Sequence, residues 1–419
     1  MDFAELIASE SFAHRARHPD FPQAFTRTRK LPLPALVGSL LCLRGQSVQG
    51  GLDHFFGTLC GATDGALGVL RHASDRAFAK ARSRLHQPAL AWLNDWVVQR
   101  AQATGFVPRW QGLRLVAADA SVLMPAVRSC HRTRSAASAE QRLFALYLPQ
   151  AELTLHASVH SAAVSERAML VEALGALGPD DVLLLDRGYP ASWLVSLLQA
   201  RGIRFVMRCD NTSGWAAGRK FMRGDTSAST VTLSAPKAQD VADWACPAAA
   251  PEVRLVRHVA STGNARLLAT NLPPEEIPAE CFGQLYHARW RVEEAFKRLK
   301  HRWALESVSG LTQQALLLDV AAKVLADNLA SLMCAAATPA LSLSTKTGKT
   351  TVRHCQRAYA AGLLPKLLPS LLIRIGDVLT NLVHALHALA ATTYRALPGR
   401  SVPRPKRRAK PHARYAYKG

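Results

Sequence analysis

Between residues 113 and 208 the chain alternates short apolar runs with helical segments, and this order constrains the fold more than any other feature. Three runs of strand length come first, at residues 113–118, 142–148 and 153–159. A helical segment at 164–177 precedes a strand at 181–186, and a second helix at 191–201 precedes a strand at 203–208. Apolar runs bounded by turn residues predict buried strands. The order strand, strand, strand, helix, strand, helix, strand therefore predicts an α/β fold with a mixed sheet.

Two aspartates stand where apolar runs of this predicted sheet end. Asp119 closes the first run and Asp186 closes the fourth. In an open α/β sheet, functional sites form at the carboxyl ends of strands. However, an Asp directly after a strand is often only a turn residue or a helix N-cap. Either residue alone is therefore weak support for a functional site. A metal site of three carboxylates would need one more acidic residue from elsewhere in the chain.

The stretch LYHARWRVEEAFKRLK, residues 285–300, contains no Pro or Gly and predicts one continuous helix. At roughly 100° per residue, one polar face carries four of its side chains, Tyr286, Arg289, Glu293 and Lys300. Glu294 points elsewhere, and an adjacent arc is apolar, so the helix can bury one side. Taken alone, the pattern is more typical of a surface helix whose Glu pairs with Arg or Lys at i,i+4 spacing.

Several motifs resemble one family of enzymes. Tyr286, Arg289, Glu293 and Lys300 match at every spacing the YREK signature of a group of DDE transposases of bacterial insertion sequences, the insertion sequence "four" family. The letters DRGY at 186–189 resemble the DRG(Y/F) motif of this group, and TNL at 270–272 resembles a segment before its final helix. The apolar run into Asp119 resembles the first motif, although DAS stands at 119–121 where many members carry Asp-Gly-Thr.

This resemblance implies a ribonuclease-H-like (retroviral-integrase-like) catalytic core, in which the strands of Asp119 and Asp186 are neighbours. It also implies that Asp119, Asp186 and Glu293 are the catalytic carboxylates and the ligands of Mg²⁺ or Mn²⁺, bound as two ions. Carboxylate oxygens suit these hard cations, and two such ions can support an in-line phosphoryl transfer. The same resemblance predicts that Tyr286, Arg289 and Lys300 bind DNA phosphates. Arg187 either contacts DNA or pairs with an acid.

Changes in composition and in predicted secondary structure along the chain predict four regions. They are a helical DNA-binding region at 1–106, the catalytic core at 107–310 with a β-rich insertion at about 209–270, a helical C-terminal region at 311–397 and a basic disordered tail at 398–419. In the first part, one helix after an N-cap at Ser74 carries a run of basic residues, Arg76, Lys80, Arg82 and Arg84. A basic helical face suits DNA recognition, and an ordinary helical domain with a solvated charged face remains the alternative.

The formal net charge of +22 indicates a polyanionic partner. Double-stranded DNA, as the terminal inverted repeats of a transposon and as target DNA, is preferred over an acidic membrane surface. The apolar stretch 315–343 carries Asp319, Lys323 and Asp327 at i,i+4 steps and is expected to be a core helix. Eight cysteines without a CxxC pair, and an N-terminus without an apolar signal segment, favour a cytoplasmic protein. The resemblance to the transposase family implies a bacterial protein associated with the nucleoid.

Together these features predict a transposase that cleaves and joins DNA strands in the cut-and-paste transposition of an insertion sequence. A homodimer is expected to bring two transposon ends together. Two alternatives remain open. One is a catalytically silent DNA-binding relative that acts as an inhibitor, and the other is a metal nuclease without strand transfer.

Overall fold

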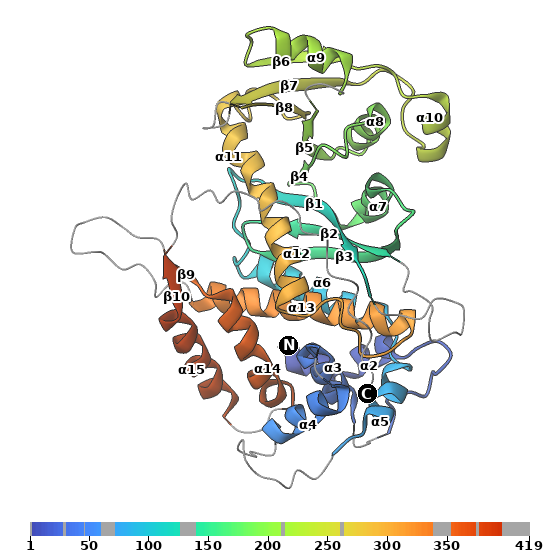
Figure 1. Ribbon diagram of the computed structural model, residues 1–419, viewed down its shortest axis with the longest axis vertical. Helices are drawn as coiled ribbons and strands as arrows, with labels where there is room; N and C mark the ends of the chain where they lie inside the picture. Colours follow the sequence, from blue (N-terminus) through green and yellow to red (C-terminus); the bar gives the residue numbers. More distant parts are fainter. Residues whose placement is uncertain are drawn as a thin grey trace, which may run out of the picture. The chain divides into compact units, whose positions relative to one another are not determined.

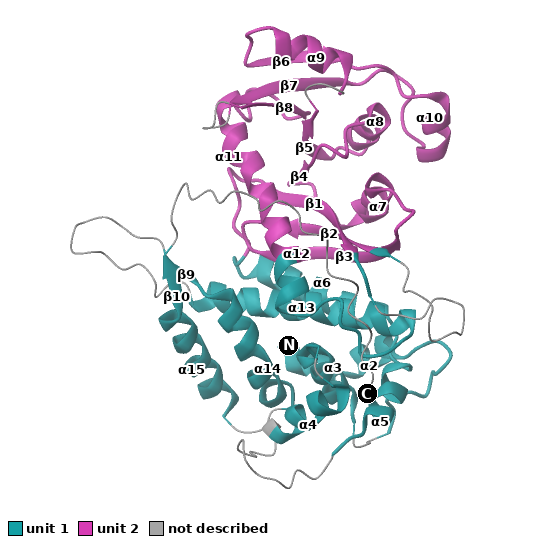
Figure 2. Cartoon of the chain, in the orientation of Figure 1, with its two compact units in different colours: residues 1–106, 123–141, 297–419 teal, residues 107–122, 142–296 magenta. Residues whose placement is uncertain are grey.

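The computed structural model describes residues 2–27, 31–45, 47–59, 72–125, 140–210, 214–259, 264–337, 353–373 and 377–395. The chain forms two compact units (Figure 2). The first, here called the sheet unit, comprises residues 107–122 and 142–296. The second, the helical unit, comprises residues 1–106, 123–141 and 297–419. Segments 1–106 and 311–397, which were predicted as separate regions, therefore lie in the same unit.

A mixed sheet of eight strands forms the framework of the sheet unit among the described residues (Figure 1), which confirms the predicted α/β class. The strand order is β3-β2-β1-β4-β5-β8-β7-β6. Strand β4 pairs in parallel with β1 and with β5, whereas β8, β7 and β6 extend the sheet by antiparallel pairing. The strands are β1 (Arg114–Leu123), β2 (Gln141–Leu148), β3 (Leu153–Ser161), β4 (Asp181–Leu185), β5 (Arg204–Cys209), β6 (Ala228–Thr232), β7 (Glu252–Val259) and β8 (Ala265–Thr270).

The segment predicted as a β-rich insertion continues the main sheet. Its strands β6, β7 and β8 join the sheet beyond β5, because β8 pairs with β5. It also contains two helices that the sequence did not predict, α9 (Ala216–Arg223) and α10 (Ala238–Trp244). Trp244 of α10 stacks on Trp193, with ring centroids 4.6 Å apart. This contact joins residues 51 positions apart, so local sequence patterns do not reveal it.

Two features near the predicted site differ from the sequence-based expectation. The first strand does not end at Asp119, because β1 continues to Leu123 although its pairing with β4 ends at Ala117. The helix predicted over 285–300 is interrupted. It consists of α11 (Phe282–His287), a 3₁₀ turn η3 (Ala288–Trp290) and α12 (Arg291–His301). The interruption lies at the buried residue Arg289, whose side-chain contacts are described below.

The remaining helices of the sheet unit are α7 (Glu166–Ala173), with the 3₁₀ turn η1 (Leu174–Ala176), α8 (Ser192–Ala200) and the 3₁₀ turn η2 (Ala279–Cys281). Figure 1 shows α7 and α8 on one side of the strands and α11 on the other. The helix α8 buries six of its side chains, Trp193 to Leu198. Helices on both sides therefore exclude water from the central strands, as the continuous apolar run of β4 requires.

The helical unit is built around α13 (Gln313–Ala337), which packs against α3, α6, α14 and α15. Its other elements are α1 (Phe3–Ala8), α2 (Glu10–Ala16), α3 (Leu33–Cys42), α4 (Val48–Leu59), α5 (Asp75–Arg82), α6 (Pro88–Ala103), β9 (Arg353–Cys355), α14 (Arg357–Ile373), α15 (Val378–Ala391) and β10 (Thr393–Arg395). Ser74 caps α5 as predicted. The predicted single helix after Ser74 is nevertheless wrong, because α5 ends at Arg82 and Pro88 begins α6.

By length and composition, α13 is apolar enough to cross a membrane, but 72 % of its most apolar window is buried inside the structure. Its three charged residues are buried and paired. The Ser309 hydroxyl donates to Asp319 at 2.8 Å, Lys323 donates to the Ala304 carbonyl at 2.8 Å, and the Trp303 indole donates to Asp327 at 3.0 Å. These contacts fit the predicted core helix as far as Ala337. Residues 338–343 of that prediction lie outside the described residues.

A buried ion pair joins β1 to β4 at the start of both strands. Arg114 Nη2 donates to Asp181 Oδ2 at 2.6 Å, and the Gly178 N–H donates to the same oxygen at 2.7 Å. The side chains are 9 % and 1 % exposed. The neighbouring acid Asp180 instead pairs with Arg109 at 2.9 Å on the surface, where its side chain is 57 % exposed.

Replacing Asp181 by Ala is expected to lower the free energy of unfolding by about 3–5 kcal/mol, because Arg114 would keep a buried charge without a partner. Urea denaturation followed by tryptophan fluorescence measures this change. The matched control is Asp180→Ala, for which a loss below about 1 kcal/mol is expected at an exposed ion pair. Equal losses in both variants would contradict the assigned role of the buried pair.

Candidate active site

Asp119 and Asp186 lie on neighbouring parallel strands of the sheet unit. Asp119 is in the second half of β1, and Asp186 follows the last residue of β4. The Ala120 N–H donates to Asp119 Oδ1 at 2.9 Å, and the Gly188 N–H donates to Asp186 Oδ1 at 2.7 Å. The charge of Asp186 raises the pKa of Asp119, in addition to the larger effect of burial, so the two carboxylates lie near each other.

The Arg289 guanidinium links the first predicted carboxylate to the third. Its Nη1 lies 3.4 Å from Asp119 Oδ2, and its Nη2 donates to Glu293 Oε1 at 2.9 Å. The Arg289 side chain is 8 % exposed, whereas Glu293 is 31 % exposed. The 3₁₀ turn η3 and the first turn of α12 therefore place the arginine and the glutamate at the strands that carry the two aspartates. The structure thus brings Asp119, Asp186, Arg289 and Glu293 together.

Tyr286 is buried and contacts the backbone beside Asp186. It is 2 % exposed, and its hydroxyl donates to the carbonyl of Leu185, the last residue of β4, at 3.2 Å. This bond fixes the end of the strand from which Asp186 follows. In this position the phenol already has a backbone partner, and its contact with a DNA phosphate stays a prediction.

The other two predicted phosphate-binding residues have different surroundings. Arg187 is exposed in the turn directly after Asp186. Lys300 belongs to the helical unit, where its Nζ lies 4.0 Å from Glu306 Oε1. Glu306 also accepts a hydrogen bond from the Met124 N–H at 3.2 Å. Lys300 is therefore anchored by a neighbouring acid near the end of α12.

A further carboxylate that was not singled out from the sequence, Glu166, lies near Asp186. It lies in the first turn of α7, and burial raises its pKa. The charge of Asp186 raises this pKa further, whereas the charges of Arg142 and Arg289 lower it. Acidic residues are common in the first turn of a helix, where they favour the helix dipole. The sequence therefore gave no signal that set Glu166 apart.

The electrostatics of this cluster suit a bound cation. Burial raises the pKa of Asp119 to about 7, the charges of Asp186 and Glu166 act in the same direction, and Arg289 and the Ala120 N–H oppose them. The positive charge of Arg289 thus offsets only part of the negative charge of these carboxylates. An oxygen donor set without His or Cys fits Mg²⁺ or Mn²⁺. In the described part of the chain, no three acidic, His or Cys side chains already have the arrangement of a metal centre. In this arrangement the Arg289 guanidinium contacts both Asp119 and Glu293.

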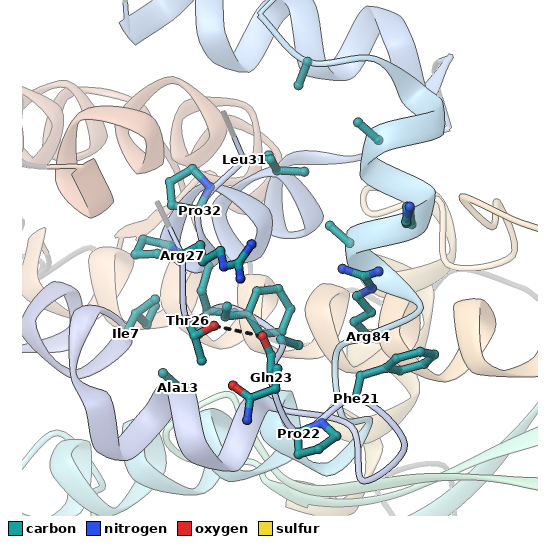
Figure 3. A pocket seen from close by; sticks show the side chains of 18 of the residues that line it. Ile7, Ala13, Phe21, Pro22, Gln23, Thr26, Arg27, Leu31, Pro32 and Arg84 are labelled. Atoms are coloured by element: carbon teal, nitrogen blue, oxygen red, sulfur yellow. Dashed lines mark hydrogen bonds between the residues drawn. The ribbon is translucent and has the colours of Figure 1, made fainter. Parts of the chain in front are cut away.

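A separate basic cavity lies in the helical unit (Figure 3). Its volume is about 1130 Å³, and Arg27, Lys80 and Arg84 are among its lining residues. The Arg84 guanidinium lies 5.6 Å from the centroid of the Phe21 ring. Arg82 was predicted on the same basic face, but it is only 7 % exposed and donates to the Ser309 hydroxyl. Arg82 therefore does not contribute to an exposed basic face, because its side chain is buried and contacts Ser309.

The chain matches the model of one protein family. Residues 111–329, more than half of the chain, match the family model described as the transposase DDE domain. Among solved structures, the chain is similar to the cryo-electron microscopy structure of the piggyBac transposase synaptic complex with hairpin DNA. That similarity has a TM-score of 0.42 and 9 % sequence identity, and it covers 95 % of this chain and 86 % of that one. No curated protein matches the chain.

The raised pKa of Asp119 predicts a pH-dependent effect on stability in the absence of divalent ions. The carboxyl titrates at 3.8 in the unfolded chain and at about 7 in the folded protein, so the folded state binds the proton more tightly. The stability of the wild type is therefore expected to fall as pH rises from about 4 to 7 through this group. Asn mimics the protonated form. The Asp119→Asn variant should gain stability over the wild type between pH 5 and pH 8, on the order of 2–3 kcal/mol.

Chemical denaturation in EDTA at several pH values measures this difference. The exposed Asp225 provides the control, since Asp225→Asn removes one carboxyl from the surface. A stability difference between Asp119→Asn and the wild type that stays constant from pH 5 to pH 8 would show that the Asp119 carboxyl does not have the raised pKa.

Proposed function

This chain belongs to the transposase DDE domain family, and on that premise we propose that it cleaves and joins DNA strands in the cut-and-paste transposition of an insertion sequence. The observation that supports this reaction is the convergence of Asp119, Asp186 and Glu293 around the buried Arg289. Asp119 and Glu293 pair with this arginine, and Asp186 lies near Asp119 where the parallel pairing of β1 with β4 ends, so the site is acidic and rich in oxygen atoms. Sites in open α/β sheets form at this kind of position.

The proposal includes the subgroup and the core fold. The match of Tyr286, Arg289, Glu293 and Lys300 to the YREK spacing supports the insertion sequence "four" group. The strand order β3-β2-β1-β4-β5, with β4 parallel to β1 and β5, supports a ribonuclease-H-like core. In this proposal, the helical segment 1–106 binds DNA, and the basic lining of its cavity contributes to phosphate contacts.

Asp119, Asp186 and Glu293 are the proposed ligands of Mg²⁺ or Mn²⁺. When bound, two such ions activate the attacking water or 3′-hydroxyl and stabilise the leaving oxygen. Arg289 then exchanges its two carboxylate partners for the oxygens of a DNA phosphate, to which a guanidinium can donate in bidentate fashion. Tyr286 holds the end of β4 in place through the Leu185 carbonyl. Lys300 and the exposed Arg187 contact neighbouring phosphates.

The proposed partner is double-stranded DNA, both as terminal inverted repeats and as target. The net charge of +22 supports a polyanionic ligand, since basic residues attract phosphates over long distances. We further propose a homodimer that holds two transposon ends, in the bacterial cytoplasm near the nucleoid.

The decisive experiment is a cleavage assay with Mg²⁺ and a labelled fragment that carries the transposon end. The wild type is expected to give nicked, hairpin or joined products. Asp119→Ala, Asp186→Ala and Glu293→Ala should each lower product formation by more than about 100-fold, beyond the loss typical of residues that only support a metal ligand. DNA binding, measured by gel shift, should remain, because the phosphate contacts come from other residues.

Glu294→Ala is the matched control, since Glu294 is the exposed neighbour of Glu293 on α12. It should retain activity close to that of the wild type. A carboxylate variant with full activity would refute the proposed site. Cleavage without joined products would identify a nuclease without strand transfer, and DNA binding without any product would identify a silent relative.

A further inference from the structure

Glu166 is held beside the loop that carries Asp186. The Ser165 hydroxyl accepts a hydrogen bond from the Ala168 N–H at 3.2 Å and so caps α7 in front of Glu166. The next residue, Arg167, donates to the carbonyls of Gly188, Tyr189 and Pro190, each at 3.1 Å. These bonds fix the first turn of α7 against the turn after β4. The position of Glu166 relative to Asp186 is therefore set by the chain itself.

Both carboxylates border the same small space at Gly188. A Cβ atom at this glycine would lie 3.1 Å from Asp186 Oδ1 and 3.7 Å from Glu166 Oε2. Among the described residues, Glu166 forms no ion pair that would account for a second acid at this place. Arg142 and Arg289 act on it only through longer-range attraction. Oxygens of both carboxylates thus lie within 4 Å of one point beside Gly188.

The Tyr189 hydroxyl gives an independent indication of a missing ligand. Its side chain is 0 % exposed, and within the described residues its oxygen has no hydrogen-bond partner. Tyr189 directly follows Gly188, the glycine that borders both carboxylates. Burial raises the pKa of this phenol, and the charges of Glu166, Asp119 and Asp186 raise it further. Buried polar groups in native proteins almost always have partners. A water molecule of a hydrated cation would supply one here, because a phenol oxygen can accept its hydrogen bond.

We propose that Glu166 is a fourth carboxylate of the site, which binds a divalent cation, Mg²⁺ or Mn²⁺, together with Asp186, while the Tyr189 hydroxyl bonds to a water of that cation. This inference rests on the proposed function, since it concerns the same acidic site. It adds a ligand from α7, outside the three carboxylates expected from the motifs. The side chain of Tyr189 thereby gains a role that Phe at the same position could not have.

The test is the binding of Mn²⁺ to the full-length protein without DNA, measured by electron paramagnetic resonance of the free ion. Glu166→Gln is expected to weaken Mn²⁺ binding by about tenfold or more. Tyr189→Phe should weaken it by a smaller factor. Glu172→Gln is the matched control, because Glu172 lies on the same helix with its side chain 66 % exposed, and it should bind as the wild type does. Equal binding by Glu166→Gln and Glu172→Gln would overturn the inference.

A second measurement needs no variant of Glu166 and so does not depend on how such a variant folds. Fe²⁺ in place of Mn²⁺, with ascorbate and peroxide, produces hydroxyl radicals that cut the backbone near the bound ion. Cuts at residues 165–167 are expected together with cuts at 186–188. Cuts at 186–188 without any at 165–167 would contradict a role of Glu166.

The same titration separates this inference from the proposed function. Asp119→Asn and Asp186→Asn are measured beside Glu166→Gln. If the two aspartate variants lose Mn²⁺ binding and Glu166→Gln does not, the three-carboxylate site stands and only the fourth ligand is refuted. If both aspartate variants bind Mn²⁺ as the wild type does, the proposed metal site itself fails.

Discussion

The candidate site depends on one buried guanidinium that lies between carboxylates from distant parts of the chain. Arg289 contacts Asp119, 170 positions earlier, and Glu293, one helical turn later. Without a positive charge, the burial of several acids in one place would be strongly unfavourable. Because burial still raises the pKa of Asp119 to about 7, the arginine alone does not balance these acids. In the proposed function, a divalent cation would offset the negative charge that the arginine leaves unbalanced.

The sheet gives this cluster its geometry. Parallel pairing of β1 with β4 sets Asp119 and Asp186 side by side, and the buried pair of Arg114 with Asp181 fixes the two strands at their opposite ends. The end of β4 is then held from two directions. Tyr286 donates to the last carbonyl of the strand, and Arg167 donates to three carbonyls of the turn that follows. The end of β4, from which Asp186 follows, is in this way held by hydrogen bonds from two side chains to its backbone.

The sequence predicted much of this arrangement where the signal was local. The strand predicted at 181–186 is confirmed as β4, which ends one residue earlier, and Ser74 was predicted as the cap that it forms. The motif spacing selected Asp119, Asp186, Arg289 and Glu293, which the fold brings together. The sequence-based predictions were wrong where tertiary contacts determine the local backbone structure. The interruption of the helix at Arg289 and the continuation of β1 past Asp119 both lie at the acidic cluster. The sequence did not distinguish Glu166, because glutamate is common in the first turn of a helix.

In the proposed function, Arg289 lies where a divalent cation would bind among Asp119, Asp186 and Glu293. A crystal structure of the protein soaked in Mn²⁺, with the ion located by anomalous scattering, tests this. We expect Mn²⁺ bound to oxygens of Asp119, Asp186 and Glu293, with the Arg289 guanidinium moved away from at least one of its two carboxylate partners. Mn²⁺ bound elsewhere, or absent from a site in which Arg289 keeps both ion pairs, would contradict it.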